Sequence, residues 1–453
     1  MRIAYTTHQF FPDYGAGTEV LTLHTAREMR ARGHEAVVFT GYPVKGRFSR
    51  ENAEDAYEYG GLPVFRFRHS NTWSLLPENP MEAEYENLFF AGLFRRELRR
   101  FRPDVVHFCH LQRVSASAVA VCFELGIPMV YTVTDFWPLC PTNQLLLPDL
   151  SLCEGPDGDG ANCIAHLAGI HGGAAGRFFR ALPPGVLGRL ARISGMISWP
   201  ERSVPAMAKA LAARPGVLRE RMNRIDAILI ATGFMGETLA RFGVERKRIR
   251  RVPFGIPGCD GTSPPATDRR RRETFRAGFI GTLYEHKGAH VLLEALRRLP
   301  ADLPVEVLLY GDAGWFPSYG ERLRSLAGGD ERVRFCGTFP GERTGEVLGG
   351  MDVLVVPSLW HENSPLVILE AQRAGVPVIA SRVGGTSELI REGENGFLFE
   401  RGDDGELSRI LERLCRDGDL VGRLSRNAPA PRTMESYAGE IEGIYRALAS
   451  GGR

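Results

Sequence analysis

The chain has 453 residues, of which 43% are hydrophobic and 24% charged, and its formal net charge is +2. Such a composition is typical of a folded globular protein, and at about 100–200 residues per domain the length predicts two or three domains. A net charge this close to zero excludes a nucleic-acid-binding protein with a large basic surface. No window holds the roughly 20 apolar residues that a transmembrane helix needs.

The ends and the charge distribution bear on location. The first residues, MRIAYTT, lead directly into a strand pattern without the features of a secretory signal, so we expect a cytoplasmic protein whose eight cysteines are reduced. Residues 170–225 hold ten Lys and Arg against two Glu, interleaved with aromatic residues such as Phe178 and Trp199. Because anionic lipids attract such segments, this one is either a peripheral contact with the inner face of a membrane or a solvated helical insertion.

The first half of the chain alternates predicted strands and helices. A strand over 2–7, a helix over about 18–32 and a strand over 35–40 begin a parallel α/β sheet. Apolar runs predict further strands at 64–67, 105–108, 129–133, 227–231 and 249–253. Residues 1–256 are therefore predicted to form a Rossmann-like domain that carries a loop and helical insertion at about 140–225.

The second half repeats this organisation after a polar connector at 257–272. Strands are predicted at 275–280, 305–310, 333–335, 353–357 and 376–380, so residues 273–432 form a second Rossmann-like domain. The remaining residues, 433–453, show the apolar spacing of a helix. Doubly wound sheets bind ligands beyond the carboxyl ends of their strands, so two such domains facing each other would enclose a binding cleft.

The strongest local signal is VLVVPSLWHENSPLVILEAQRAGVPVIAS at 353–381. A buried strand is predicted to end at Pro357 and a helix to begin with Ser364 as N-cap and Pro365 as its first residue. The free N–H groups of such a helix start suit a diphosphate. Glu362 and Glu370 stand on either side of it and could accept hydrogen bonds from sugar and ribose hydroxyls, or could be only a helix cap and a solvated helix residue.

With other stretches of the chain, this segment resembles the Glu-x7-Glu signature of retaining GT-B glycosyltransferases of family 4. The other stretches are HQFFPDYGAGTEV at 8–20, GFIGTLYEHKGAHVLLEAL at 278–296 and GGTSELIREGENGFLF at 384–399. The resemblance extends over nearly the whole chain except about 140–225. It implies an α/β fold of two Rossmann-like domains facing across a cleft, with the helix at 433–453 crossing back to the first domain.

The resemblance also implies roles for single residues. Lys287 would bind the donor diphosphate, Glu362 the donor sugar and Glu370 the ribose. The full set of donor-binding residues that it implies is Gly15, Gly17, Thr282, Lys287, Gly337, Glu362, Asn363, Ser364, Pro365, Leu366 and Glu370.

Two positions depart from the family's pattern. Thr282 stands where the family usually has a second diphosphate-binding Arg, and Thr134 stands where many relatives have the His of a His-Asp pair. The residues left near the second position are Asp135, His107 and His110. We take Asp135, together with Glu362 and Lys287, as the predicted catalytic residues.

These observations predict a nucleotide-sugar-dependent glycosyltransferase that retains anomeric configuration. The donor would be a UDP-, GDP- or ADP-sugar and the acceptor a sugar or a lipid-linked sugar, in bacterial polysaccharide or glycolipid assembly. No cofactor is expected for front-face substitution, because the protein acts by positioning and by stabilising charge. The alternatives are a sugar-nucleotide epimerase or hydrolase of the same fold, and an inactive nucleotide-sugar-binding protein, which the two threonines would suit.

A last motif lies in the insertion. Cys140, Cys153, Cys163 and His166 fall within 27 residues, and three thiolates with one imidazole complete the tetrahedral shell of structural zinc. The surrounding residues are rich in Gly and Pro and need some constraint to be ordered. A disulfide between two of the cysteines, or three free thiols, are the alternatives.

Overall fold

The computed structural model of the protein describes residues 1–43, 53–69, 79–157, 160–171, 186, 203–257 and 273–451. The chain divides into two compact units. The first unit comprises Met1–Pro253 and Met434–Arg453, and the second comprises Phe254–Thr433. Most of the predicted connector and most of the basic segment at 170–225 lie outside the described residues.

The first unit is built on an eight-stranded sheet with the strand order β3-β4-β2-β1-β5-β6-β7-β8. All neighbouring strands run parallel except β3 and β4, which form an antiparallel hairpin at one edge. The strands are β1 (Arg2–Thr7), β2 (Glu35–Pro43), β3 (Glu54–Tyr59), β4 (Leu62–His69), β5 (Val105–Phe108), β6 (Met129–Thr132), β7 (Ala227–Ile230) and β8 (Ile249–Arg251).

The sequences of the strands explain their places in this sheet. Strands β5, β6 and β7 read VVHF, MVYT and AILI and are buried along their whole length, as expected of central parallel strands covered on both faces. Strand β3, EDAYEY, alternates between exposed and half-buried residues because it lies at the edge. Because acidic residues are spread along β3, the strand contains no apolar run, and the sequence analysis did not predict it.

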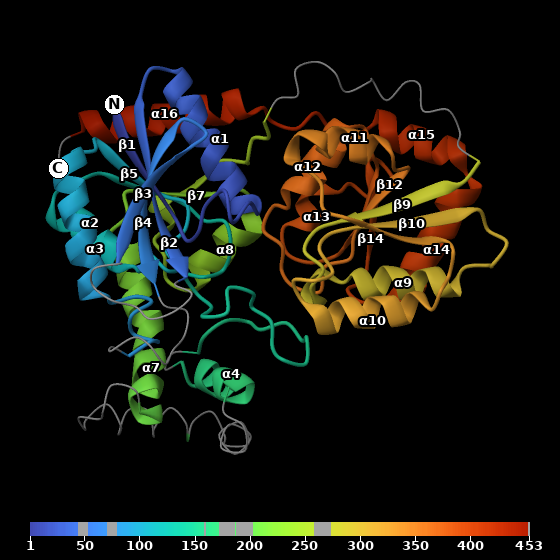
Figure 1. The fold of residues 1–453 in the computed structure, drawn as a ribbon, viewed down its shortest axis with the longest axis horizontal. Helices are drawn as coiled ribbons and strands as arrows, with labels where there is room; N and C mark the ends of the chain where they lie inside the picture. Colours follow the sequence, from blue (N-terminus) through green and yellow to red (C-terminus); the bar gives the residue numbers. More distant parts are fainter. Residues whose placement is uncertain are drawn as a thin grey trace. The chain divides into compact units, whose positions relative to one another are not determined.

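Helices of the first unit pack in pairs. Helices α1 and α16 contact each other, as do α2 and α3, and α4 and α7. Figure 1 shows α16, drawn in red, beside α1. The helices are α1 (Gly17–Ala31), α2 (Leu88–Phe101), α3 (Ser117–Glu124), α4 (Ala161–His171), α7 (Val204–Met222), α8 (Gly233–Arg241) and α16 (Met434–Ser450).

The second unit contains a six-stranded, fully parallel sheet with the order β11-β10-β9-β12-β13-β14. The chain builds this sheet outward from β9 in one direction and from β12 in the other, so the topological switch point lies between these two strands. The strands are β9 (Phe275–Ile280), β10 (Val305–Tyr310), β11 (Val333–Gly337), β12 (Val353–Val356), β13 (Val378–Ser381) and β14 (Gly396–Phe399).

Helices cover both faces of this second sheet. Figure 1 shows α9 and α10 on one face and α11 and α12 on the other. Helix α9, AHVLLEALRR, buries its apolar stripe against the sheet and ends in two arginines, which favour the negative end of the helix dipole. The helices are α9 (Ala289–Arg298), α10 (Pro317–Ala327), α11 (Thr344–Gly349), α12 (Leu366–Arg373), α13 (Thr386–Leu389), α14 (Asp404–Arg416) and α15 (Gly418–Arg426).

Candidate functional site

Lys287 lies beyond the carboxyl end of β9, in the 3-10 turn η4 (Glu285–Lys287). The turn ends at Gly288, whose φ of 74° lies in the left-handed region. A Cβ atom at Gly288 would stand 1.8 Å from the carbonyl oxygen of Pro357, at the end of β12. Only glycine therefore allows the β9 loop to approach the β12 loop this closely, and this approach fixes the backbone position of Lys287.

Glu362 lies beyond the carboxyl end of β12 and is 6% exposed. The loop after β13 packs against its backbone, because the N–H of Gly385 donates to the Glu362 carbonyl oxygen over 2.7 Å. Gly384 has a φ of 51°, and a Cβ atom there would stand 2.4 Å from the same oxygen. The loops after β9, β12 and β13 thus meet at Glu362, the β13 loop through its backbone and the β9 loop through its carboxylate.

Three side chains donate to a single oxygen of this carboxylate. Oε1 of Glu362 accepts from Nζ of Lys287 at 2.8 Å, from Oγ of Ser358 at 2.7 Å and from Nε1 of Trp360 at 2.8 Å. Within the part of the chain that the structure describes, no hydrogen bond reaches the other oxygen, Oε2. Burial raises the pKa of Glu362, but the Lys287 charge and these three hydrogen bonds outweigh burial and lower the pKa overall. Glu362 is therefore an ionised carboxylate whose Oε1 accepts three hydrogen bonds and whose Oε2 accepts none from the described residues.

Glu370 sits on α12 and has a different environment. Burial raises the pKa of its carboxyl group to about 7, and the nearby Arg373 offsets this only in part. The two glutamates of the Glu-x7-Glu signature thus differ in charge near neutral pH: Glu362 is ionised, whereas Glu370 titrates there.

The start of α12 differs from the sequence prediction. The helix begins at Leu366 with Pro365 as its N-cap, and no side chain caps it. Ser364, predicted as the N-cap, lies before this start, so the prediction of a Ser-Pro cap was wrong. Proline at the N-cap leaves the N–H groups of the first helical turn without a side-chain acceptor.

The remaining predicted donor-binding residues of the second unit lie at strand ends or beside α12. Thr282 follows β9, Gly337 ends β11 with a φ of 68°, and Asn363 is buried beside Glu362. Strand ends on one edge of a parallel sheet define one ligand-binding edge. The carbonyl of Thr282 accepts from the N–H of Tyr284.

The first unit carries a second polar cluster at its own switch point, between β1 and β5. Gly15 and Gly17 lead into α1, and the carboxylate of Glu19 accepts from the N–H of Ala16 at 2.8 Å. Glu19 is fully buried, which raises the pKa of its carboxyl group to about 7. Nε2 of His8 lies 3.4 Å from Oε1 of Glu19.

Asp135, predicted to be catalytic, has both carboxylate oxygens engaged. Oδ2 lies 2.8 Å from Nε2 of His110, and Oδ1 accepts from the N–H of Trp137 at 2.9 Å. Nδ1 of His110 accepts from the N–H of Gln112, so the ring proton is on Nε2 and is donated to Asp135. The His110 ring in turn lies 4.2 Å, centroid to centroid, from that of His8. Asp135 therefore orients His110.

The other residues named around this position have structural partners. Thr134 accepts from the hydroxyl of Thr18 at 3.0 Å, which ties the glycine loop to the end of β6. His107 is buried and lies within hydrogen-bonding distance of the hydroxyls of Tyr445 and Thr132. Burial lowers the pKa of His107 to about 3, so the ring is neutral and links α16 to the sheet.

The predicted zinc ligands share one small cavity. Cys140, Cys153, Cys163 and His166 all line it, and the three cysteines are free thiols. Burial raises the pKa of the Cys163 thiol to about 12, and proximity to the Cys140 thiol adds to this effect. Among the described residues, no group of three or more His, Cys, Asp or Glu is arranged to hold a metal ion.

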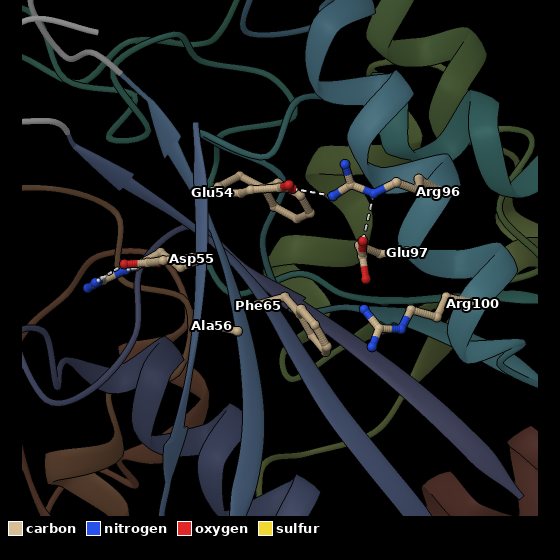
Figure 2. Close-up of a pocket in the computed structure, with 9 residues that line it drawn as sticks. Glu54, Asp55, Ala56, Phe65, Arg96, Glu97 and Arg100 are labelled. Atoms are coloured by element: carbon tan, nitrogen blue, oxygen red, sulfur yellow. Dashed lines mark hydrogen bonds and ion pairs between the residues drawn. The ribbon is translucent and has the colours of Figure 1, made fainter. Parts of the chain in front are cut away.

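A further pocket of about 370 Å³ lies between the edge hairpin and α2, away from these strand ends. Figure 2 shows Arg96 bonded to Glu54 and to Glu97, with Arg100 beside them. Arg66 also lines the pocket and pairs with Asp55. Of these ion pairs, that of Arg96 with Glu54 joins α2 to the hairpin, and none of the predicted site residues lines the pocket.

Sequence analysis missed four residues of the two clusters: Ser358, Trp360, His8 and Glu19. Ser358 and Trp360 lie inside the segment that carried the strongest signal, four and two residues before Glu362, respectively. Glu19 follows the glycine loop, within the helix predicted at about 18–32, where no motif marks it. Only its full burial reveals it.

The two units thus define an α/β protein with a polar cluster at the switch point of each sheet, and the cluster of the second sheet is built around the Lys287–Glu362 ion pair. Residues 16–255 match the model of the glycosyl transferase 4-like domain, and residues 274–417 match that of glycosyl transferases group 1. Because the first match spans more than half of the chain, the chain belongs to the glycosyl transferase 4-like family.

Individual relatives agree with this assignment. The chain is 32% identical over 220 residues to D-inositol 3-phosphate glycosyltransferase of Corynebacterium urealyticum, an alignment that covers 44% of this chain and 51% of the relative. It is 31% identical over 260 residues to the enzyme of the same name from Acidothermus cellulolyticus, covering 53% and 57%. The chain thus spans about half the length of these curated relatives.

Solved structures share the fold over the whole chain. The Anabaena protein HepE, solved in complex with UDP-glucose, has a TM-score of 0.64 and 18% identity, with 99% of this chain and 100% of that chain covered. Sucrose-phosphate synthase from Thermosynechococcus elongatus has a TM-score of 0.66 and 18% identity, with 99% of each chain covered. The fold is therefore that of GT-B glycosyltransferases, with two parallel-sheet α/β units.

Proposed function

We propose that the protein transfers a glycosyl group from a nucleotide sugar to an acceptor hydroxyl, with retention of anomeric configuration. The observation that carries this proposal is the Lys287–Glu362 pair at the switch point of the second sheet. The ammonium stabilises the charge on a departing diphosphate, and the open oxygen of Glu362 accepts from a hydroxyl of the donor sugar. Glu370 accepts from the ribose.

The remaining donor contacts follow from the same edge of the sheet. The diphosphate lies at the start of α12, where the N–H groups of Asn363, Ser364 and Leu366 supply donors and Pro365 sets the turn. Thr282 and Gly337 border the site at the edge of the second sheet. In the first unit we propose Gly15 and Gly17 as further donor-binding residues, and Asp135, which is hydrogen-bonded to His110, as a catalytic residue. A donor phosphate oxygen takes the proton of the acceptor hydroxyl, so the reaction needs no protein nucleophile and no cofactor.

The similar proteins suggest which donors and acceptors to test. HepE was solved with UDP-glucose, so a UDP-sugar is the first donor to test, followed by GDP- and ADP-sugars. The D-inositol 3-phosphate glycosyltransferases are named for a polyol phosphate acceptor. We propose a sugar or lipid-linked sugar acceptor in bacterial polysaccharide or glycolipid assembly, at the cytoplasmic face of the membrane.

A donor screen tests this function. Thermal unfolding is measured with each nucleotide sugar, and a ligand at 100 times its Kd should stabilise the protein by about 2.7 kcal/mol. Product is then sought with and without acceptor sugars by mass spectrometry, and the anomeric configuration is read from the proton coupling. Turnover without any acceptor would instead identify an epimerase or a hydrolase, and donor binding without turnover an inactive binding protein.

Two proposals concern partners. Among the described helices, none combines the length and the apolarity needed to span a bilayer. Binding to anionic vesicles that is lost at high salt would support peripheral membrane contact through residues 170–225, most of which lie outside the described part of the chain. Vesicles without anionic lipid serve as the control, and no binding at low salt would contradict this contact.

The second partner is structural zinc at Cys140, Cys153, Cys163 and His166. The shared cavity supports it, although the thiols would have to turn toward a common centre. Elemental analysis of protein purified without chelator tests it, with Cys122, buried elsewhere in the first unit, mutated to Ser as the control for thiol loss. Less than about 0.2 equivalents of metal would rule the site out, since a structural site is occupied when the protein folds.

A further inference from the structure

The donor site contains a tryptophan that contacts both members of its ion pair. Trp360 donates its indole N–H to Oε1 of Glu362 at 2.8 Å. Its ring faces Nζ of Lys287, which lies 4.8 Å from the ring centroid. The three side chains come from the loops after β9 and β12, so one residue holds the two loops' charged groups at once.

The surroundings of Trp360 favour a single cation on its ring. The His286 ring lies 4.9 Å from the Trp360 ring, centroid to centroid. Burial lowers the pKa of His286 to about 3, and the Lys287 charge lowers it further, so this imidazole is neutral. The N–H of Leu359 donates to the carbonyl of His286 at 2.7 Å and fixes the backbone on both sides. Lys287 is therefore the one cation among these neighbours that benefits from the aromatic face.

We propose that Trp360 is the positioning residue of the Lys287–Glu362 pair. The Trp360 N–H and the Ser358 hydroxyl both donate to Oε1 of Glu362 and so leave Oε2 for the donor sugar. The Trp360 ring holds the Lys287 ammonium beside the Glu362 carboxylate before any donor binds. When a donor diphosphate arrives, the ammonium is already placed and need not be ordered. This consequence for transfer rests on the proposed function, whereas the positioning itself is a property of the protein alone.

The lysine content of the chain makes the positioning measurable without activity. The sequence contains four lysines, Lys45, Lys209, Lys247 and Lys287, so acetylation by a water-soluble amine reagent can be followed at each site by mass spectrometry. Both lysines are ion-paired, Lys287 with Glu362 and Lys247 with Glu245, but the Lys287 side chain is 26% exposed and that of Lys247 is 75% exposed. Acetylation of Lys287 relative to Lys247 therefore reports how firmly the ammonium is held.

The test compares W360L, which removes the ring and the N–H, with W360F, which keeps a ring. We expect W360L to raise the relative acetylation rate of Lys287 about threefold or more, because the ammonium loses its contact with the aromatic face. W360F keeps an aromatic ring, so its rate should lie close to that of the wild type. W315L is the matched control, because Trp315 is 62% exposed. Unchanged acetylation rates at Lys209 verify the fold of each variant. W360M, whose side chain fills more of the space left by the indole, is the second variant.

The outcomes separate this proposal from the proposed function. Equal acetylation of Lys287 in wild type and in both W360L and W360M would overturn the positioning role, whether or not the protein transfers sugar. In the transfer assay W360L should lower kcat about tenfold or more with a smaller change in KM, and W360F should recover part of the loss. A wild-type protein that transfers no sugar would count against the function, and acetylation would still decide the positioning role.

Discussion

Lys287 and Glu362 are 75 residues apart in the chain, yet Nζ of one lies 2.8 Å from Oε1 of the other. The pair forms because β9 and β12 are neighbours in the sheet, and the loop after each strand carries one member. The Glu362 side chain is 7% exposed, so its charge has little contact with water and depends on its partner. Removing one member should therefore have a different effect from removing both.

We predict that K287M lowers the free energy of unfolding by about 1–3 kcal/mol, because it leaves a buried carboxylate without its cation. The double variant K287M/E362Q should recover much of this loss, since no charge then remains buried. Chemical denaturation of the wild type, the two single variants and the double variant measures the coupling. Strictly additive effects would show that the two side chains do not stabilise each other.

The close approach of the two loops predicts a strong effect of G288A. The new Cβ atom would meet the Pro357 carbonyl oxygen at 1.8 Å on a residue with φ of 74°. We expect a loss of more than about 2 kcal/mol of stability and weaker donor binding, because the β9 loop must move.

G328A is the matched control. Gly328 also has a positive φ, 56°, but the nearest atom to its Cβ would be 3.7 Å away. Only the backbone strain remains there, so we expect a loss of about 1 kcal/mol and unchanged donor affinity. Similar losses in the two variants would refute a special role for the contact at Gly288. Thermal unfolding and donor titration measure both quantities.

The raised pKa of Glu370, about 7, predicts a pH dependence with a definite sign. Between the ordinary glutamate pKa and pH 7 the folded protein binds more protons at this site than the unfolded chain does. The contribution to stability is therefore complete at acidic pH and is lost as the pH rises through about 7. E370Q should match wild type near pH 4 and exceed it by about 1–2 kcal/mol at pH 8.

Donor binding should show the opposite trend in the wild type. The ionised Glu370 accepts more strongly from ribose hydroxyls, so donor affinity should rise between pH 6 and pH 8 and be nearly constant in E370Q. Glu19, whose pKa is also about 7, is present in both proteins and cancels in the comparison. Calorimetric titration at three pH values decides, and parallel profiles in the two proteins would contradict the assignment of Glu370.

The Asp135–His110 hydrogen bond of 2.8 Å predicts coupled effects on transfer. If Asp135 acts by orienting His110, then D135N and H110N each lower kcat by about tenfold, and the double variant is no worse than either. Steady-state kinetics of the four proteins measure this coupling. If the two losses in kcat instead multiply in the double variant, Asp135 acts in catalysis independently of His110.

The sequence by itself determined the two parallel sheets, since apolar runs such as VVHF, AILI and VLVV mark strands buried on both faces. It also predicted which residues would carry the donor chemistry, because the resemblance assigned this role to Lys287, Glu362 and Glu370 from local motifs. Local patterns did not reveal the edge strand β3 or the start of α12, where flanking contacts decide between several acceptable conformations.

Only the tertiary structure decided how the donor residues act on one another. The order of the strands brings β9 beside β12, and this neighbourhood alone pairs Lys287 with Glu362 and places Trp360 on both. The same is true of Asp135, which was predicted to be catalytic and whose carboxylate is hydrogen-bonded to His110 at the end of the neighbouring strand β5. A motif specifies the chemistry of a side chain, but its charge and orientation depend on burial and on partners distant in sequence, which the packing of the whole sheet determines.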